Sequence, residues 1–361
     1  MKNRIRVFAA AVCAMVIMSS CSIFQTGQTS KTSSESGSSV SQKNQEKESQ
    51  QDKSDPSGEN SSITPESSSD SGKTSQETEN SKTSADESSK ASAESSGESS
   101  IIPTPYCRSA VLYSVDDKKI IYDDGADIVT APASMTKLLT ASVMLNNMNE
   151  NDIVTVGSEL DLVHADSSIC YISVGNQIKV RDLLTGMLLN SGNDAAYTAA
   201  VTTARSVHSG EELSDTEAVD IFCGMMNSLA SQIGMNSSHF STPDGWDDDD
   251  QYITASDMAK LCEYALGFPV IREIVGTYQK SVVFESGESI TWTNTNELLD
   301  PDSAYYCENA IGMKTGTTDN AGCCLAAAFE KDGRTYISVV TGCGTSSDRY
   351  EMTLKVFNKA K

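Results

Sequence analysis

The feature that most limits what this chain can fold into is the serine-rich stretch between residues 31 and 100. It contains 25 serines in 70 positions, and Lys, Glu, Gln and Thr fill much of the remainder. A segment with so few large apolar side chains cannot bury enough surface to offset the entropy of ordering it. We therefore predict a disordered, serine-rich linker at 22–100 and a folded domain at 101–361.

The first 21 residues have the pattern of an export signal. The basic segment MKNRIR precedes the apolar run VFAAAVCAMVIM, which is too short to span a bilayer comfortably as a helix. Ser19 and Ser20 before Cys21 resemble a bacterial lipobox, although Met18 stands where leucine is usual. This resemblance implies that residues 1–21 are a lipoprotein signal, that Cys21 carries a lipid, and that the protein is anchored to a membrane outside the cytoplasm, at the bacterial cell surface or in the periplasm. The alternative is an ordinary secretory signal with an incidental cysteine.

The predicted folded domain is acidic and contains several cysteines. Of the chain's net charge of −23, the first 21 residues contribute +3 and the linker −7, which leaves −19 and no basic stripe for nucleic acid. Eight of the ten cysteines lie in this domain without a CxxC spacing, and the chain has only three histidines, so no metal site is expected. Cys323 and Cys324 would face opposite sides of a strand and should not bond to each other. Which of the others form disulfides stays open.

Apolar periodicity places strands at both ends of the domain and helices between them. A hairpin is predicted around DDKK, another around Gly287, and three strands in AIGMKTGTT, GCCLAAAFE and TYISVVTGC. Helices are predicted from about Val180 to Leu189, after NSGN, and in DTEAVDIFCGMMNSLASQIGM, TASDMAKLCEYALG and RYEMTLKVFN. This order predicts an α/β (α+β) domain, with an antiparallel sheet and a mainly helical lobe.

The stretch TAPASMTKLLTASVML, from Thr130 to Leu145, contains a lysine where burial is expected. Pro132 suits the first turn of a helix, and a helix would place Ser134 and Lys137 one turn apart on the same face. The residues that follow are apolar on most sides, as in a core helix. A lysine at this point either extends to the surface or has a function in the interior.

Three short motifs favour the second interpretation. They are SxxK at Ser134–Lys137, SGN at Ser191–Asn193 and KTG at Lys314–Gly316, whose first residues are 57 and 123 positions apart. Each pattern occurs once in the chain, and each is weak evidence by itself. In this order, with SDN as the usual middle member, the trio is typical of penicillin-binding proteins and class A β-lactamases.

On these motifs, and on the longer stretches GNQIKVRDLLTGMLLNSGNDAA and IGMKTGTTDNAGCCLAAA, the domain resembles the serine-type D-alanyl-D-alanine carboxypeptidases, the low-molecular-weight penicillin-binding proteins. The segment MNSSHFSTPDGWDDDDQYITASDMAKL is also similar, although Gln251 replaces the usual histidine before the tyrosine. The resemblance implies the penicillin-binding/β-lactamase-like fold, with a five-stranded antiparallel sheet flanked by helices. It also implies cleavage of the terminal D-Ala from peptidoglycan stem peptides ending in D-Ala-D-Ala, inhibition by β-lactam antibiotics, and no metal or cofactor. Many relatives have a further domain and an anchor after the peptidase domain, and we expect the N-terminal lipid to replace that anchor here.

The resemblance further implies a role for each motif residue. Ser134 would be the nucleophile, Lys137 its base, and Ser191 a relay of the proton to the leaving amine. A serine needs such a base, and both burial and a nearby cation such as Lys314 disfavour the ammonium form of a lysine. Backbone N–H groups of Ser134 and Thr317 would stabilise the oxyanion. Substrate binding would involve Asn193, Lys314, Thr315, Gly316, Thr317 and Arg349; the arginine could equally be a surface residue at the start of a helix.

Three related functions remain as alternatives. A class A β-lactamase would need an ExxLN segment after SGN, whereas the only ExxL, at Glu159 to Leu162, precedes it. An endopeptidase for peptide cross-links would use the same residues. A non-enzymatic penicillin sensor would not need Lys137 and Ser191 together. Asp247–Asp250 could bind calcium, but a solvated loop is the simpler interpretation.

Overall fold

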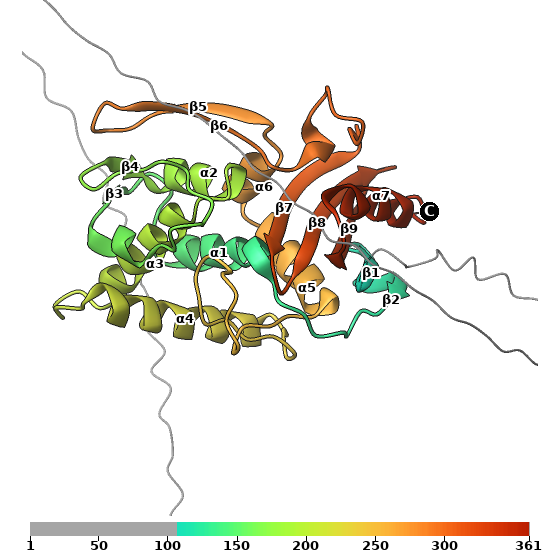
Figure 1. Ribbon diagram of the computed structural model, residues 1–361, viewed down its shortest axis with the longest axis horizontal. Helices are drawn as coiled ribbons and strands as arrows, with labels where there is room; N and C mark the ends of the chain where they lie inside the picture. Colours follow the sequence, from blue (N-terminus) through green and yellow to red (C-terminus); the bar gives the residue numbers. More distant parts are fainter. Residues whose placement is uncertain (1–106, 361) are drawn as a thin grey trace, which may run out of the picture. The chain divides into compact units, whose positions relative to one another are not determined.

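The structure is a computed structural model that describes residues 107–360 (Figure 1). The predicted signal, Cys21 and the predicted linker lie outside the described residues. Within the described part, no helix is both long and apolar enough to cross a membrane.

Both ends of the described chain contribute to one five-stranded antiparallel sheet. Strands β1 (Ser109–Ser114) and β2 (Lys119–Asp124) come from its start, and β7 (Ala310–Thr318), β8 (Gly322–Lys331) and β9 (Arg334–Cys343) come from its end. The order β2-β1-β9-β8-β7 pairs the first strand with the last. The predicted five-stranded antiparallel sheet is therefore confirmed, and β7, which carries KTG, is an edge strand next to the helical lobe (Figure 1).

Helices cover both faces of this sheet. Alternate residues of β1 point to opposite faces, since Ala110 and Leu112 join one buried cluster while Val111 and Tyr113 join another. Helix α7 (Ser346–Phe357) packs on the first face, and α5 (Ala255–Leu266) packs on the second (Figure 1). The second cluster continues into the helical lobe, so the sheet and the lobe share one core.

The helical lobe is built around α1 (Lys137–Asn147), in which every residue from Lys137 to Met144 is buried. Around it lie α2 (Val180–Leu189), α3 (Asn193–Val207) and α4 (Asp215–Gln232). The remaining elements are short: α6 (Pro269–Val275), the ribbons β3 (Ile153–Thr155) with β4 (Gln177–Lys179) and β5 (Gln279–Val283) with β6 (Ser289–Thr293), and the 3-10 turns η1 (Ala133–Thr136), η2 (Ser158–Leu162) and η3 (Glu297–Leu299).

The start of α1 differs from the prediction of a helix near Pro132. Ala133 has φ of +49°, a left-handed conformation that an α-helix cannot contain. The 3-10 turn η1 begins at this residue, and the α-helix begins only at Lys137. Residues three apart eclipse each other in a 3-10 turn, so Ser134 and Lys137 still share a face.

The cysteines of the described chain are either paired in a disulfide or free. A disulfide joins Cys107 to Cys343 and links the start of the described chain to the end of β9. The expectation that Cys323 and Cys324 face opposite sides of the sheet is confirmed, because they pack against different buried clusters.

Candidate active site

The hydroxyl of Ser134 lies beside a fully buried amine. Lys137 is 0% exposed, and its Nζ is 2.8 Å from Ser134 Oγ. The same Nζ is 2.7 Å from Asn193 Oδ1 and 2.7 Å from the backbone carbonyl of Asp244. The last two atoms can only accept hydrogen bonds. A neutral lysine that donates both of its N–H bonds to them directs its lone pair at the Ser134 hydroxyl.

The surroundings of Lys137 favour this neutral form. Burial lowers the pKa of Lys137 to about 8, and the opposing charges of Asp244, Asp194 and Cys170 recover only part of the loss. Burial likewise holds the pKa of Lys314 well below its usual value, with repulsion from Lys137 and Arg349 as further causes. The lowered pKa of Lys137 agrees with the predicted effect of burial. A nearby Lys314 is also expected to lower the pKa of Lys137, but the repulsion between the two lysines lowers the pKa of Lys314 instead.

Strand β7 carries KTG directly against η1. A Cβ at Gly316 would lie 2.8 Å from the Ala133 Cβ and 3.2 Å from the Ser134 backbone nitrogen, so only glycine permits this approach. Lys314 is 1% exposed, and its Nζ donates to the Thr315 carbonyl at 3.1 Å. The strand edge and the SxxK serine therefore share one site.

The SGN motif lies at the start of α3, and Asn193 is the first residue of that helix. Gly192 is needed here, because a Cβ would be 2.6 Å from Cys170 Sγ. The carboxylate of Asp194 accepts hydrogen bonds from the backbone N–H groups of Cys170, Ile172 and Ala195, which fixes the segment beside the motif. No hydrogen bond links Ser191 to Lys137 or Ser134 in the described part of the chain.

A loop that the sequence analysis did not assign to the site completes it. This loop, residues 241–251, supplies the Asp244 carbonyl to Lys137, and Gly245 packs so tightly on η1 that a Cβ would be 1.9 Å from the Ala133 carbonyl oxygen. Gln251 is 4% exposed and closes the loop on itself: its Oε1 accepts from Thr242 N at 3.0 Å, and its Nε2 donates to the Trp246 carbonyl at 2.7 Å. The residue that departs from the family pattern therefore holds this loop in place.

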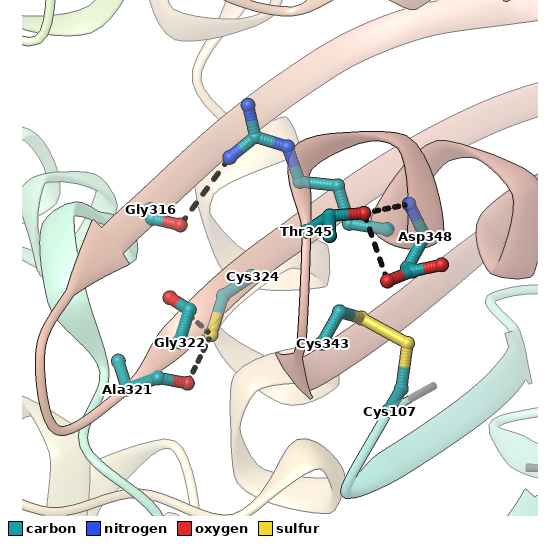
Figure 2. Close-up of a disulfide and its surroundings, with 9 residues drawn as sticks. Cys107, Gly316, Ala321, Gly322, Cys324, Cys343, Thr345 and Asp348 are labelled. Carbon is teal, nitrogen blue, oxygen red and sulfur yellow. Dashed lines mark hydrogen bonds between the residues drawn. A yellow bond between two sulfur atoms is a disulfide. The ribbon is translucent and has the colours of Figure 1, made fainter. Parts of the chain in front are cut away.

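Arg349 reaches the KTG strand from α7. It is 8% exposed, and its Nη1 donates to Thr317 Oγ1 at 3.1 Å and to the Gly316 carbonyl at 3.4 Å. Figure 2 shows the Gly316 carbonyl on its strand, with a dashed line for this hydrogen bond. The interpretation of Arg349 as a surface residue is therefore wrong. Thr315 is also engaged, through a hydrogen bond of 2.6 Å between its hydroxyl and that of Thr295.

A cavity of about 650 Å³ opens above these groups. Trp246 forms part of its wall and stacks on His164 with ring centroids 4.4 Å apart. Lys137 and Lys314 are buried and are not part of its lining. Its lining consists of Ser134, Asp166, Ser167, Ser168, Asn193, Gly245, Trp246, Asp247, Thr317, Thr318, Asp319 and Asn320.

Two of the acidic side chains that the sequence singled out, Asp247 and Glu159, have structural partners. Asp247 accepts hydrogen bonds from Thr318 Oγ1 at 2.6 Å and from the backbone nitrogen of Asn320 at 2.9 Å, which ties the 241–251 loop to the β7–β8 turn. Glu159 is 2% exposed, bonds to Thr198, and does not line the cavity. Across residues 107–360, no cluster of three or more His, Cys, Asp or Glu side chains could hold a metal ion.

Left-handed backbone conformations occur at all three motifs. Ala133, Ser191 and Met313 have φ of +49°, +60° and +96°, and each lies in or directly before a motif. Residues other than glycine adopt such conformations at a cost of about 1–3 kcal/mol, and they concentrate at functional sites. Surrounding contacts must hold the three motifs in these conformations.

Comparisons with known proteins agree with this geometry. The family model for D-alanyl-D-alanine carboxypeptidase matches residues 97–345. The D-alanyl-D-alanine carboxypeptidase DacF of Bacillus subtilis is 29% identical over 256 residues, and DacA of Escherichia coli is 32% identical over 261 residues. These matches cover 70% and 69% of this chain but 61% and 59% of the relatives, so the chain spans less than two thirds of their length.

Solved structures give the same result. The crystal structure of the Streptomyces K15 DD-transpeptidase is 30% identical, with a TM-score of 0.64, and the match covers 71% of this chain and 97% of that one. The D-alanyl-D-alanine carboxypeptidase DacD of Francisella tularensis is 25% identical, with a TM-score of 0.60, over 70% of each chain. Sequence, fold and site geometry together place this chain in the D-alanyl-D-alanine carboxypeptidase family.

Proposed function

We propose that this protein is a serine-type D-alanyl-D-alanine carboxypeptidase that removes the terminal D-Ala from peptidoglycan stem peptides. The observation that carries the proposal is the position of the Lys137 amine, which two carbonyl acceptors orient toward Ser134 Oγ at 2.8 Å. A buried lysine in this position suits the role of general base to a serine nucleophile. Membership of the family and the names of its relatives support the same activity.

In the proposed reaction, Lys137 takes the proton of Ser134 as Oγ attacks the carbonyl carbon of the penultimate D-Ala. The backbone N–H groups of Ser134 and Thr317 stabilise the oxyanion. Collapse of this intermediate breaks the peptide bond, and Ser191 passes a proton to the departing D-Ala amine. Water then hydrolyses the acyl-serine and restores the Ser134 hydroxyl.

The remaining site residues bind the substrate in this proposal. Asn193 holds the substrate amide with its side chain, while its Oδ1 also accepts from Lys137. Gly316 lets the strand edge approach the nucleophile. The terminal carboxylate lies among hydroxyl and basic groups that can donate hydrogen bonds to an anion: Lys314, Thr315, Thr317 and Arg349.

We further propose that the enzyme acts outside the cytoplasm as a lipoprotein. Cleavage before Cys21 and lipidation of that residue would anchor it, and residues 22–100 would act as a disordered tether for the 101–361 domain. The Cys21→Ala variant tests this. If Cys21 carries the lipid, the variant protein should leave the membrane fraction; if the signal is an ordinary secretory one, its fractionation should not change.

Release of D-Ala from a peptide ending in D-Ala-D-Ala tests the activity. The full chain should release D-Ala, Ser134→Ala should abolish release, and Ser228→Ala, at an exposed hydroxyl on α4, should not alter it. The assay is run in two formats, without and with an amine acceptor, because the K15 relative is named a DD-transpeptidase. Transfer of the peptidyl group to an amine would proceed through the same acyl-serine. No release in either format, with penicillin still bound to Ser134, would refute the carboxypeptidase.

β-Lactams are the expected inhibitors of this site. Glu159 lies outside the cavity, so no ExxLN glutamate is in place to activate water against the acyl-enzyme. A penicilloyl-Ser134 adduct that persists for many turnovers of the peptide substrate would agree with this. Rapid hydrolysis of penicillin would instead indicate a β-lactamase.

A further inference from the structure

A third sulfur lies beside the Cys107–Cys343 disulfide. Cys343 ends β9, and on the neighbouring strand β8 its cross-strand partner is Cys323. Directly opposed residues of an antiparallel pair point to the same face, with Cβ atoms about 4.5–5.5 Å apart. Cys323 also packs against the apolar cluster that contains Cys107 and Cys343. Its thiol therefore lies within reach of the disulfide.

The backbones of β8 and β9 approach each other closely at this point. Gly322 has φ of +65°, and a Cβ there would be 2.9 Å from the Cys343 carbonyl oxygen and 3.3 Å from the Gly342 Cα. If β8 and β9 moved apart at this point, the close contact of Gly322 with the backbone of Gly342 and Cys343 would be lost. The approach keeps the Cys323 side chain next to Cys343.

The adjacent thiol provides an internal contrast. Cys324 is fully buried on the other face, its Sγ donates to the Ala321 carbonyl at 3.4 Å, and burial raises its pKa to about 11 (Figure 2). Cys323 is partly exposed and faces the disulfide. Of the two neighbouring thiols, only Cys323 combines access to solvent with a disulfide in reach.

The disulfide is also connected to the candidate active site. Two residues after Cys343, Thr345 caps α7: its Oγ1 accepts from the Asp348 backbone nitrogen at 3.1 Å and donates to the Asp348 carboxylate at 2.8 Å (Figure 2). Arg349 follows in the first turn and donates to Thr317 Oγ1 at 3.1 Å. The anchor on Cys343 therefore helps to fix the junction from which Arg349 reaches the KTG strand.

We propose that Cys323, Cys343 and Cys107 form a thiol–disulfide exchange site, and that the bond in place sets the position of Arg349. The second half of this proposal rests on the proposed function, in which Arg349 lies at the substrate carboxylate. The Cys323 thiolate attacks Cys343 Sγ, a Cys323–Cys343 bond forms, and the Cys107–Cys343 bond breaks. Cys107 leaves as a thiolate and takes up a proton. One disulfide replaces another, so no oxidant or reductant is consumed.

Disulfide mapping of the full chain tests the exchange itself. The chain is held without reductant at about pH 7 or about pH 8.5, quenched with acid, alkylated in denaturant and analysed by mass spectrometry. The thiolate is the attacking species, so the Cys323–Cys343 bond should form faster at the higher pH, as seen in samples quenched at successive times. It should persist in Cys324→Ser and disappear in Cys323→Ser. Detection of Cys107–Cys343 alone at both pH values, with Cys323 alkylated, would overturn the exchange.

A locked variant tests the link to Arg349. In Cys107→Ser, glutathione disulfide should oxidise the Cys323 and Cys343 thiols to one bond while being reduced to two molecules of glutathione. The same variant, kept reduced, is the matched control. Weakening a hydrogen bond to a charged group should raise KM for the D-Ala-D-Ala peptide about tenfold in the oxidised form, with a smaller change in kcat. Equal KM values in the two forms would overturn the link.

These readouts separate the exchange from the proposed function. If the parent chain releases no D-Ala, the proposed function fails, but the mapped disulfides still decide the exchange. The rate of Ser134 acylation by a labelled penicillin then replaces KM as the comparison between the oxidised and reduced forms. A rate that differs between the forms supports the link, and the same rate in both overturns it.

Discussion

At the scale of the residue, Lys137 acquires from its surroundings a property that lysine lacks in water. A free lysine has a pKa of about 10.4 and holds its proton at neutral pH. Here burial lowers the pKa to about 8, and the Asn193 and Asp244 carbonyl groups leave one direction for the lone pair. Burial accounts for the lowered pKa, and the two carbonyl acceptors account for the orientation.

The pKa predicts how acylation depends on pH. Below pH 8 the amine is mainly protonated and cannot accept the Ser134 proton, so acylation by a labelled penicillin should rise about tenfold per pH unit and level off above about pH 8. Lys137→Arg should slow acylation by about 10²–10⁴-fold, because its guanidinium stays protonated. A flat profile between pH 6 and 9 in the parent would contradict the role of Lys137.

A charge placed beside the amine should move this profile. Asn193→Asp puts a carboxylate where Oδ1 now lies 2.7 Å from Lys137 Nζ, and an opposite charge so close favours the ammonium form. The inflection of the acylation profile should move to higher pH by about 1–3 units. Asn190→Asp serves as the control, since Asn190 bonds to the Ile169 carbonyl instead. An unchanged inflection in Asn193→Asp would show that the amine is not the titrating group.

At the scale of the element, the site exists because η1, β7 and the 241–251 loop approach one another more closely than side chains usually permit. Gly316 and Gly245 make this possible, because a Cβ at either position would collide with η1, which carries Ser134. Gln251 holds the loop with an amide that donates and accepts at once. An amide does so independently of pH, unlike the histidine usual at this position.

Gly245→Ala tests this packing. Gly245 has φ of +88°, and a Cβ would meet the Ala133 carbonyl oxygen at 1.9 Å, so we expect a loss of about 3 kcal/mol or more in the free energy of unfolding, together with slower acylation. Gly287→Ala, in the β5–β6 turn, is matched: its φ is +104°, but a Cβ there meets nothing within 4 Å. It should lose about 1–2 kcal/mol from backbone strain alone. Denaturant unfolding of both variants decides, and equal losses would rule out the close contact as the cause.

Short elements were the hardest to foresee. The hairpins, the three C-terminal strands and the helix at Val180–Leu189 carry clear periodicity and were predicted. By contrast, β3 and β4 have three residues each, too few to show alternation, and α6 has seven. The 3-10 turn before α1 is not predicted, because a left-handed Ala133 has no sequence signature.

At the scale of the whole molecule, the proposed anchor and linker set where the enzyme acts, whereas the folded domain carries out the proposed reaction. Deleting residues 31–100 should leave kcat/KM unchanged for a soluble D-Ala-D-Ala peptide, since the proposed catalytic and substrate-binding residues all lie between Ser134 and Arg349. Release of D-Ala from intact cell walls by the anchored enzyme should fall, because a shorter tether reaches less far. Comparing both substrates with the parent and the deletion variant checks this. A loss on the soluble peptide would place part of the catalytic function in the linker.

The sequence by itself determined which residues to propose for the chemistry of the site. SxxK, SGN and KTG are patterns of side chains whose order and spacing indicate a serine nucleophile with a lysine base, and the clear periodicity around them indicates the sheet and the helical lobe. These features depend on residue type and short-range spacing, which a sequence displays directly.

Only the tertiary structure decided how that chemistry is held in place. The Asp244 carbonyl lies 107 residues from Lys137 in the chain, and every residue offers the same carbonyl, so no pattern marks this one. The disulfide joins cysteines 236 residues apart, which the sequence could not choose among eight candidates. From the sequence, Arg349 could equally be a surface residue or a residue of the site. Its burial follows from the packing of α7 on β8 and β9. The first two contacts join segments far apart in the chain, and the third depends on how α7 packs on the sheet, so only the folded backbone brings the partners together.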